Sequence, residues 1–362
     1  MIKRILPLLI FLIGFLLSAN VLYAQDNNDD IELEYRKWRV TLFPPLSTNG
    51  LEAPNYTARY SINFLGGYHG GLDGAEFGGL INYNKYYTHG GQFAGLANIS
   101  GRDMLGINFA GITNISQGDM SGIQFAGLVN HSGNDLEGIQ GAGIINFSGG
   151  NSSGLQFAGV ASVSNGDLEG LQGAGVINSA LGDISGLQAA GVANIAKEDV
   201  EGLQAAGVLN FAGSDISGLQ ASGVSNIALG DIEGLMASGA FNFARNDASG
   251  FLMTGGINYA RDLEGVSLAG VANIARELEG LQFAGILNAS QSATGLQIGI
   301  INVAQEFEGV PIGFISYYGN GRKNIDVRFS DGGFTDIGLT LGTHRVYNSA
   351  IFGYNTLGSY EV

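Results

Sequence analysis

Residues 186–217 read GLQAAGVANIAKEDVEGLQAAGVLNFAGSDIS, in which one sixteen-residue unit occurs twice in succession. The first Gly of this unit recurs at steps of sixteen from Gly74 to Gly250, and then at steps of fifteen, fifteen, fifteen and fourteen as far as Gly309. Counting places from that Gly, the consensus is G-[LI]-Q-x-A-G-[VIL]-x-N-x-[AS]-x-x-D-[LIV]-[ES]. Such a fixed period indicates a repeat architecture.

The unit is typical of short β-strands joined by turns. Gly at places 1 and 6 is too frequent for a helix interior, and no helical period of apolar residues is present. Segments such as Asn165-Gly166-Asp167 supply turn residues once per unit. The sequence therefore predicts an all-β protein.

Two all-β architectures fit this unit. In a parallel β-solenoid of about fifteen coils, each unit is one coil, equal places stack about 4.8 Å apart, and the Gln and Asn columns form amide ladders. In an antiparallel transmembrane β-barrel, each unit is one strand and a turn. The even places of a strand, such as Leu203 and Leu209, would then face lipid, while the half-polar odd places line the lumen.

Three features favour the solenoid. A Gly stands at place 6 of every unit from Gly79 to Gly313, where a straight strand gains nothing from lacking a side chain but a corner does. Gln297 and Asn302 lie five residues apart whereas Gln282 and Asn288 lie six apart, a deletion that would turn side chains to the wrong face of a straight strand. Tyr is nearly absent from the array, although spanning barrels carry aromatic girdles. We therefore predict that the chain turns at place 6.

The residue before each unit alternates between Ser and Glu, as in Ser185, Glu201, Ser217 and Glu233, so the full period is 32 residues. In a solenoid this alternation keeps Glu from stacking directly on Glu, which would cost about 0.9 kcal/mol at 4.8 Å even in water.

Four regions are predicted along the chain. Residues 1–24 resemble a secretory signal peptide, with Lys3 and Arg4 before an apolar run too short to span a membrane and with Ala24 at the cleavage site. Residues 25–65 form a linker and entry strands, and residues 66–316 form the repeat array. Residues 317–362 form β-hairpins that either cap the solenoid or begin a membrane-type sheet.

Composition limits the function. The chain has no Cys, so neither disulfides nor a lipid-bearing N-terminal Cys can hold it. Its net charge is −16, or −18 without the signal peptide, and such a charge repels nucleic acid. A nucleic-acid partner is therefore excluded.

The residues that could carry chemistry are few. A column of Asp at place 14 could gather Ca²⁺ in a stacked solenoid, although capping of turns by Asp is the favoured interpretation; it includes Asp167, Asp183, Asp199, Asp215 and Asp231. The four His residues show no metal-binding spacing and are expected as isolated turn or surface residues. No cluster of acidic residues is seen to break the repeat. We predict no catalytic site, no cofactor and no other metal.

The segments LSTNG at 46–50, SINFLGGY at 61–68 and GVPIGFISYYGNG at 309–321, together with the iterated GLQxAGxxN, resemble the bacterial surface repeat-containing family of exported, outer-membrane-associated proteins. The resemblance implies a location at the outer membrane or cell surface of a Gram-negative-type bacterium and assigns no active residue. The predicted role is structural or adhesive, with an unknown surface ligand or envelope component bound through exposed Gln, Asn and acidic ladders. The alternative is an outer-membrane barrel or channel.

Overall fold

The computed structural model describes residues 32–331 and 333–355, and the predicted signal peptide lies outside them. The described chain is all-β apart from one short 3-10 helix, as predicted. Among the described residues, no helix has the length and apolar character needed to cross a membrane.

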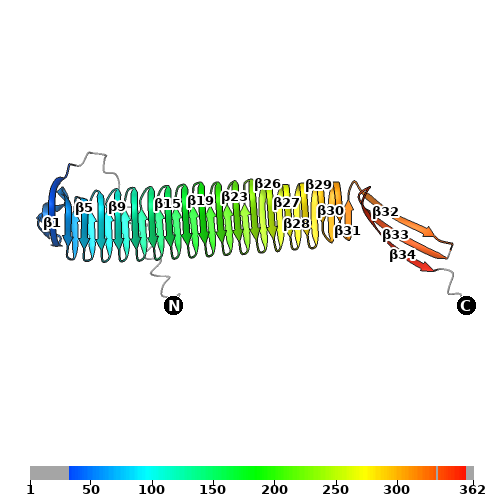
Figure 1. Ribbon diagram of the computed structural model, residues 1–362, viewed down its shortest axis with the longest axis horizontal. Coiled ribbons are helices and arrows are strands. Elements are labelled where there is room, and N and C mark those ends of the chain that lie inside the picture. Colours follow the sequence, from blue (N-terminus) through cyan, green and yellow to red (C-terminus); the bar gives the residue numbers. More distant parts are fainter. Residues whose placement is uncertain (1–31, 332, 356–362) are drawn as a thin grey trace. The chain divides into compact units, whose positions relative to one another are not determined.

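The repeat array is a parallel β-solenoid of about sixteen turns (Figure 1). In a representative coil, β21 (Val200–Ala206) is a long strand and β22 (Leu209–Ala212) a short one. Strand β21 pairs in parallel and in register with β19 (Ile184–Ala190) and β23 (Ile216–Ser222). Because neighbouring units run in the same direction with equal places opposite each other, the alternative antiparallel barrel is wrong for the array.

Each coil contributes one strand to each of two sheets. The other long strands are β5 (Gly71–Gly78), β7 (Thr88–Ala94), β9 (Met104–Ala110), β11 (Met120–Ala126), β13 (Leu136–Ala142), β15 (Ser152–Ala158), β17 (Leu168–Ala174) and β25 (Ile232–Ser238). The other short strands are β4 (Gly66–His69), β6 (Ile81–Asn84), β8 (Ala97–Ser100), β10 (Thr113–Ser116), β12 (Val129–Ser132), β14 (Ile145–Ser148), β16 (Ala161–Ser164), β18 (Ile177–Ala180), β20 (Ala193–Ala196) and β24 (Ser225–Ala228).

In the last coils a short strand runs on into the following long strand, and most of these units are shorter than sixteen residues. The continuous strands are β26 (Phe241–Thr254), β27 (Ile257–Ala269), β28 (Ala272–Ala284), β29 (Leu287–Ile298) and β30 (Ile301–Ile312), and the last strand of the solenoid is β31 (Ile315–Tyr318). The one-residue deletion at 297–302 is absorbed in the turn between β29 and β30, as the predicted corner requires.

Two Gly columns shape each coil for different reasons. At place 6, where the chain turns, a Cβ on Gly207 would lie 2.1 Å from the carbonyl oxygen of Gly191 in the preceding coil, so no side chain fits. The predicted corner is confirmed. At place 1, within the long strand, Gly202 has φ +131°, a conformation that favours Gly. The repeat pattern alone does not indicate this second requirement.

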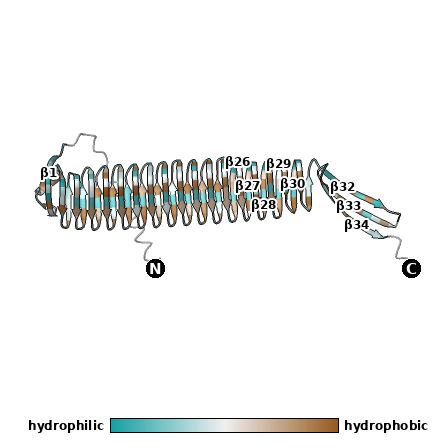
Figure 2. Ribbon diagram, in the orientation of Figure 1, coloured by the Kyte–Doolittle hydropathy of each residue, from teal (hydrophilic) through white to brown (hydrophobic). Residues whose placement is uncertain are grey.

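The interior of the solenoid is narrow and half polar. Val200, Gln204, Asn210 and Ala212 represent the columns that point inward, and all are buried. The Gln and Asn columns are therefore core residues, and the prediction that these amides form exposed adhesive ladders is wrong. Many of the residues at places 2, 4, 7, 8 and 10, most of them apolar, are partly or fully exposed instead. Figure 2 shows apolar and polar residues in every coil of the array.

Both flanks contain the predicted strands. At the N-terminal side lie β1 (Glu34–Phe43), β2 (Leu46–Ser47), the 3-10 helix η1 (Gly50–Asn55) and β3 (Tyr56–Asn63). At the C-terminal side, β32 (Arg322–Phe329), β33 (Phe334–Gly342) and β34 (Tyr347–Asn355) form an antiparallel sheet. Ile325, Val327 and Phe352 are exposed on this sheet. That it belongs to a membrane-type sheet stays a prediction.

Candidate interaction surface

Two amide ladders run through the core with opposite polarity. Gln204 donates its Nε2 to Gln188 Oε1 of the preceding coil at 2.9 Å. Asn194 donates its Nδ2 to Asn210 Oδ1 of the following coil at 2.9 Å, and also to the backbone oxygen of Ala205. Stacked amides at the coil spacing thus satisfy one another, which removes the cost of burying them. Groups engaged in this way are not available to a ligand.

Missing rungs confirm the two polarities. At place 3, Asn108 is too short to bridge its neighbours, and both of its amide atoms are left without a hydrogen bond, as are Gln92 Oε1 and Gln124 Nε2. Met236 leaves Gln220 Oε1 without a donor. In the other ladder Ser162 replaces Asn and leaves Asn178 Oδ1 without a donor.

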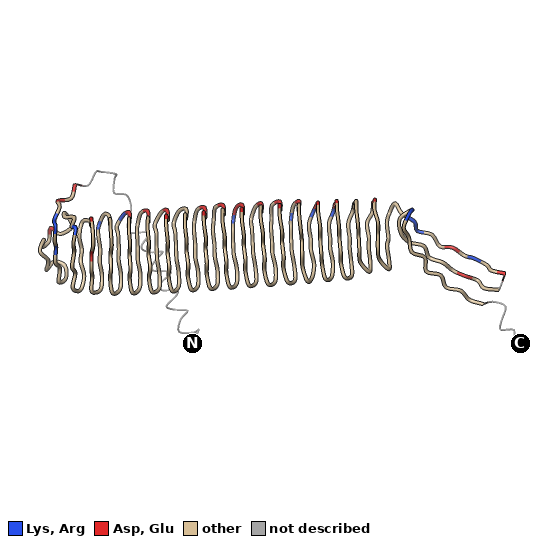
Figure 3. Tube along the Cα trace, in the orientation of Figure 1, with Lys and Arg blue, Asp and Glu red and all other residues tan. Residues whose placement is uncertain are grey.

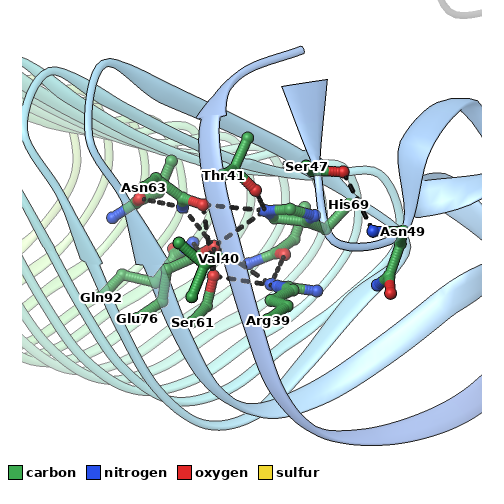
Figure 4. A network of polar contacts seen from close by, with 12 residues as sticks. Arg39, Val40, Thr41, Ser47, Asn49, Ser61, Asn63, His69, Glu76 and Gln92 are labelled. Atoms are coloured by element: carbon green, nitrogen blue, oxygen red, sulfur yellow. Dashed lines mark hydrogen bonds and ion pairs between the residues drawn. The ribbon is translucent and has the colours of Figure 1, made fainter. Parts of the chain in front are cut away.

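A charged cluster closes the ladders at the N-terminal end (Figure 4). Glu76 occupies the place that Gln holds in later coils. Its carboxylate accepts from Gln92 Nε2 at 2.8 Å, Asn63 Nδ2 at 2.8 Å and Arg39 Nη2 at 3.0 Å. Nε2 of His69 lies 3.0 Å from Asn63 Oδ1. The cluster joins β1 to the first coils.

Burial and pairing fix the charges of the cluster. Burial alone would raise the pKa of Glu76, but Arg39, His69 and the amide donors lower it to about 2. Burial, together with Arg39, lowers the pKa of His69 to about 3, so this imidazole is neutral and donates from Nε2 to Asn63. Arg39, His69 and Glu76 are each at most 1% exposed, which makes the cluster a structural cap.

The prediction of isolated turn or surface His is wrong for two of the four residues. His69 is fully buried, and His131 is buried with its ring stacked on Phe147 at 5.1 Å. His89 and His344 are on the surface, as predicted. The available signal for the cluster was Glu76 itself, a single acidic residue at a place where the repeat otherwise has an amide or a neutral residue.

Asp and Glu line one edge of the solenoid, here called the acidic edge and made of places 12–16 (Figure 3). Its Asp column caps turns, because from residue 119 to residue 247 the backbone N–H at place 14 donates to Oδ1 of the Asp or Asn one coil earlier; Asp231 N lies 2.7 Å from Asp215 Oδ1, and Asp215 N lies 3.0 Å from Asp199 Oδ1. Hydrogen bonds from Ser214 and from this backbone N–H lower the pKa of Asp199. Asp167 and Asp183 make the same contact.

The structure thus shows the turn capping that the sequence favours. Within residues 32–331 and 333–355, no three His, Cys, Asp or Glu side chains are grouped closely enough to hold a metal ion. Binding of Ca²⁺ by the Asp column stays a prediction.

Charge is confined to this one edge. Between residues 74 and 318, every Asp, Glu, Lys and Arg other than the buried Glu76 stands at places 12–16 of its unit. Places 1–11 therefore form a charge-free side of the solenoid. It comprises the turn at places 6 and 7 and the parts of the long and short strands next to that turn, whereas the Glu of place 16 lies on the first part of the long strand, as Glu201 does in β21.

The turn of the charge-free side carries an apolar edge at place 7, interrupted at Ala240 and Gly256. Its exposed members recur along the array: Leu80, Leu96, Ile112, Val160, Val176, Val192, Val208, Val224, Val271, Ile286, Ile300 and Phe314. Place 4 adds phenyl rings in the first coils, where Phe93 and Phe109 stack at 5.7 Å and help to line a groove of about 690 Å³. Soluble monomers rarely expose a continuous apolar patch above a few hundred Å². This surface is the candidate site of interaction.

Comparison of the chain with protein-family models, with curated proteins and with solved structures gives no match. The resemblance to the bacterial surface repeat-containing family therefore stays a prediction.

Proposed function

We propose that the chain is an exported bacterial cell-envelope protein with a structural or binding role and no catalytic one. The observation that carries this proposal is the separation of charge in the solenoid. One edge is acidic, and the remaining surface is charge-free and exposes apolar side chains over the whole array. A long repeated apolar surface suits adhesion or assembly within an envelope.

The absence of a catalytic role is supported by where the reactive groups lie. Exposed carboxylates recur as equivalent copies along the acidic edge, whereas catalysis needs one unique arrangement. The unique arrangement that the described chain does contain, around Glu76, is buried, and the Glu76 carboxylate is occupied by hydrogen bonds from Arg39 and Gln92 that join β1 to the first coils. We therefore assign binding to the charge-free side and not to the Gln and Asn ladders, which are buried.

Export is supported by the signal-peptide pattern of residues 1–24 and by the acidic, Cys-free composition of residues 25–362. The tagged full chain, expressed in a Gram-negative host, is expected in the envelope fraction with its N-terminus at Gln25, and protease added to intact cells is expected to digest the array. A control chain with Lys3→Glu and Arg4→Glu should be processed less. An unprocessed chain in the cytoplasm would contradict the proposal.

A further inference from the structure

The charge-free side wraps around three surfaces of the solenoid, and this shape limits what can cover it. Exposed apolar side chains occur on the outer face of the long strands, at the turn and on the outer face of the short strands, for example Phe157, Val160 and Ile257. A second folded protein would pack on one of these faces and leave the other two in water. A fluid apolar phase covers all three at once.

We infer that the charge-free side enters the hydrocarbon of one leaflet of a lipid surface, with the apolar edge deepest and the acidic edge in water. This inference rests on the proposed binding role of that side. It commits to phospholipid as the partner, whereas self-association of the solenoid is a competing outcome.

The backbone at the apolar edge is suited to hydrocarbon, where an unsatisfied N–H group costs several kcal/mol. The turn amides donate to the preceding coil: Gly207 N to Ala190 O at 3.2 Å, and Val208 N and Leu209 N both to Val192 O at 3.0 Å. The same pattern recurs along the array. Unlike an ordinary loop, this turn has its N–H groups satisfied by the preceding coil and presents a Val side chain to its surroundings.

The height of the charge-free side matches one leaflet. Place 2 on the long strand and place 10 on the short strand are each four residues from the turn at place 6. At the rise of a β-strand, the distance from the turn to either place is about 13 Å. Half of a bilayer's hydrocarbon core measures about 15 Å. The polar residues at places 2, 4, 7, 8 and 10 are few; besides Tyr they are Thr113, Ser179, Ser225 and His131, and His131 is buried.

The charges determine how the solenoid is oriented on a lipid surface and which lipid headgroups it prefers. The acidic edge lies opposite the apolar edge, so the net charge of −16 stays largely in water. No basic residue stands at places 1–11 to attract anionic headgroups. Binding should therefore depend on apolar contact and be stronger on zwitterionic than on anionic vesicles, the reverse of a basic amphipathic helix.

The test is flotation of the purified full chain with phosphatidylcholine vesicles. We expect the chain to float with the vesicles, and addition of phosphatidylglycerol to weaken the binding. In Val160→Glu/Val192→Glu/Val224→Glu, charges enter the apolar edge in every second coil, and partition should fall more than tenfold. A control, Leu181→Glu/Leu229→Glu, places two new charges at the acidic edge and should bind like the original chain, and Val160→Glu/Val192→Glu, with two charges at the apolar edge, should still weaken the binding.

A second measurement does not depend on these charged variants folding. Because the chain has no Cys, Val208→Cys and Leu181→Cys can each carry one environment-sensitive fluorophore at sites of equal exposure, 43% each. With vesicles, emission from position 208 should shift to shorter wavelength and emission from position 181 should not. Equal shifts at both sites, or no flotation, would overturn the inference.

Two further outcomes separate this inference from its alternatives. A blue shift at position 208 without vesicles, accompanied by a doubled mass in light scattering, would assign the apolar edge to a second copy of the chain and would also overturn it. A chain that is exported and processed but does not bind vesicles would leave the proposed envelope role standing, whereas a chain that binds vesicles but stays in the cytoplasm would remove only that role.

Discussion

The first and the last coils of the solenoid end the same ladder of Gln side chains with different chemistry. Each Gln donates toward the N-terminus, so the first coil must supply an acceptor and the last coil a donor. At the first coil the acceptor is the carboxylate of Glu76, which receives Gln92 Nε2. At the last coil the donor is the hydroxyl of Tyr318, which lies 3.1 Å from Gln297 Oε1.

The Asn ladder has the reverse polarity, so its N-terminal end needs a hydrogen-bond donor and its C-terminal end needs an acceptor. At the N-terminal end its free acceptor is Asn63 Oδ1, which the neutral His69 fills with Nε2–H. At the other end Asn302 donates Nδ2 to the backbone oxygen of Ile312 at 3.1 Å. Ser316 lies opposite Asn302 in the last strand, where a further Asn would have no following Asn to accept its hydrogen bond. The direction of each ladder thus decides which residue type can close it.

The two ends also differ in how they cover the apolar columns. At the C-terminal end the rings of Phe307 and Tyr318 stack at 4.3 Å and fill the interior, and burial raises the pKa of the Tyr318 hydroxyl. At the N-terminal end the covering residue is Arg39, and its buried positive charge is balanced by the ion pair with Glu76. One end is therefore ionic and the other aromatic and neutral, and the ionic end should be the more sensitive to single changes.

The largest effect is expected for Glu76→Gln. The new amide would present N–H groups to Gln92, Asn63 and Arg39, and it would leave a buried guanidinium unpaired, which costs about 3–5 kcal/mol. Because contacts in a solenoid are between neighbours, the loss should stay local. Hydrogen exchange should accelerate in β3, β5 and β7 and remain unchanged in β28–β30.

The matched control is Glu233→Gln, the same change at an exposed site on the acidic edge, which should cost less than about 0.5 kcal/mol. Equal effects of the two substitutions would show that the ionic end contributes nothing beyond an ordinary surface carboxylate.

Acid should open the ionic end first. His69 has a pKa of about 3 in the folded chain and about 6.5 when unfolded, so its contribution is full above pH 6.5 and is lost as the pH falls toward 3. Glu76, with a folded pKa of about 2, adds a loss below pH 4.5. Between pH 6.5 and 4.5 the His69 effect amounts to about 2–3 kcal/mol.

The neutral end gives the comparison, because Phe307, Tyr318 and Gln297 do not titrate in this range. Hydrogen exchange at pH 4.5 should therefore increase in β3–β7 before β28–β31, and His69→Gln should reduce that pH dependence while the exposed His89→Gln does not. Simultaneous opening of both ends on acidification would contradict this assignment.

Tyr318→Phe should have a smaller effect at the other end. The ring and its stacking on Phe307 remain, but Gln297 Oε1 loses its donor, which costs about 1–2 kcal/mol. Faster exchange should be confined to β29–β31. Tyr317→Phe, on the exposed neighbour of the same strand, serves as the control and should leave exchange unchanged.

Much of this architecture was predictable, because a stacked coil repeats its constraints in every unit. The place 6 Gly and the deletion near Gln297 indicate the corner, and the alternation of Ser and Glu fits neighbours in register, as Ser185 and Glu201 are. The inward face was not predictable from the usual rule that apolar residues are buried. Here the Leu of place 2 and the Phe of place 4 face outward, whereas Gln and Asn are inside because equal amides stacked at the coil spacing satisfy one another.

The two ends were harder to predict for a different reason. Arg39 and Glu76 are 37 residues apart and come from a flank and the array, so their pairing depends on how β1 lies across the first coil. Glu76 itself is visible as a departure from the Gln column, and Tyr318 as a departure from the Ala and Ser column at place 11. A break in a column does not by itself mark an end, because Asn108, Met236 and Ser162 also break their columns inside the stack.

Filling a gap in the Gln ladder should stabilise the solenoid in coils that contact neither end. Asn108→Gln would supply partners for Gln92 Oε1 and Gln124 Nε2, which now have none. We expect a gain of about 1 kcal/mol in the free energy of unfolding, measured by chemical denaturation. Asn108→Leu, of similar volume but without an amide, should not reproduce the gain, and an equal gain from Leu would assign the effect to apolar packing.

The smallest effect is expected from a chelator, since protein groups alone supply the hydrogen bonds that close both ends. The Asp column already uses one carboxylate oxygen per turn as a cap, and Asn151 does the same without a charge, with Asp167 N at 2.9 Å from its Oδ1. A neutral amide that serves equally well argues that capping, not cation binding, places Asp there. Excess EDTA should leave the melting temperature unchanged, and Asp199→Asn should be nearly neutral. A melting temperature that falls with chelator and returns with Ca²⁺ but not with Mg²⁺ would instead make the acidic edge a calcium site, and metal would then stabilise the middle of the stack more than either end.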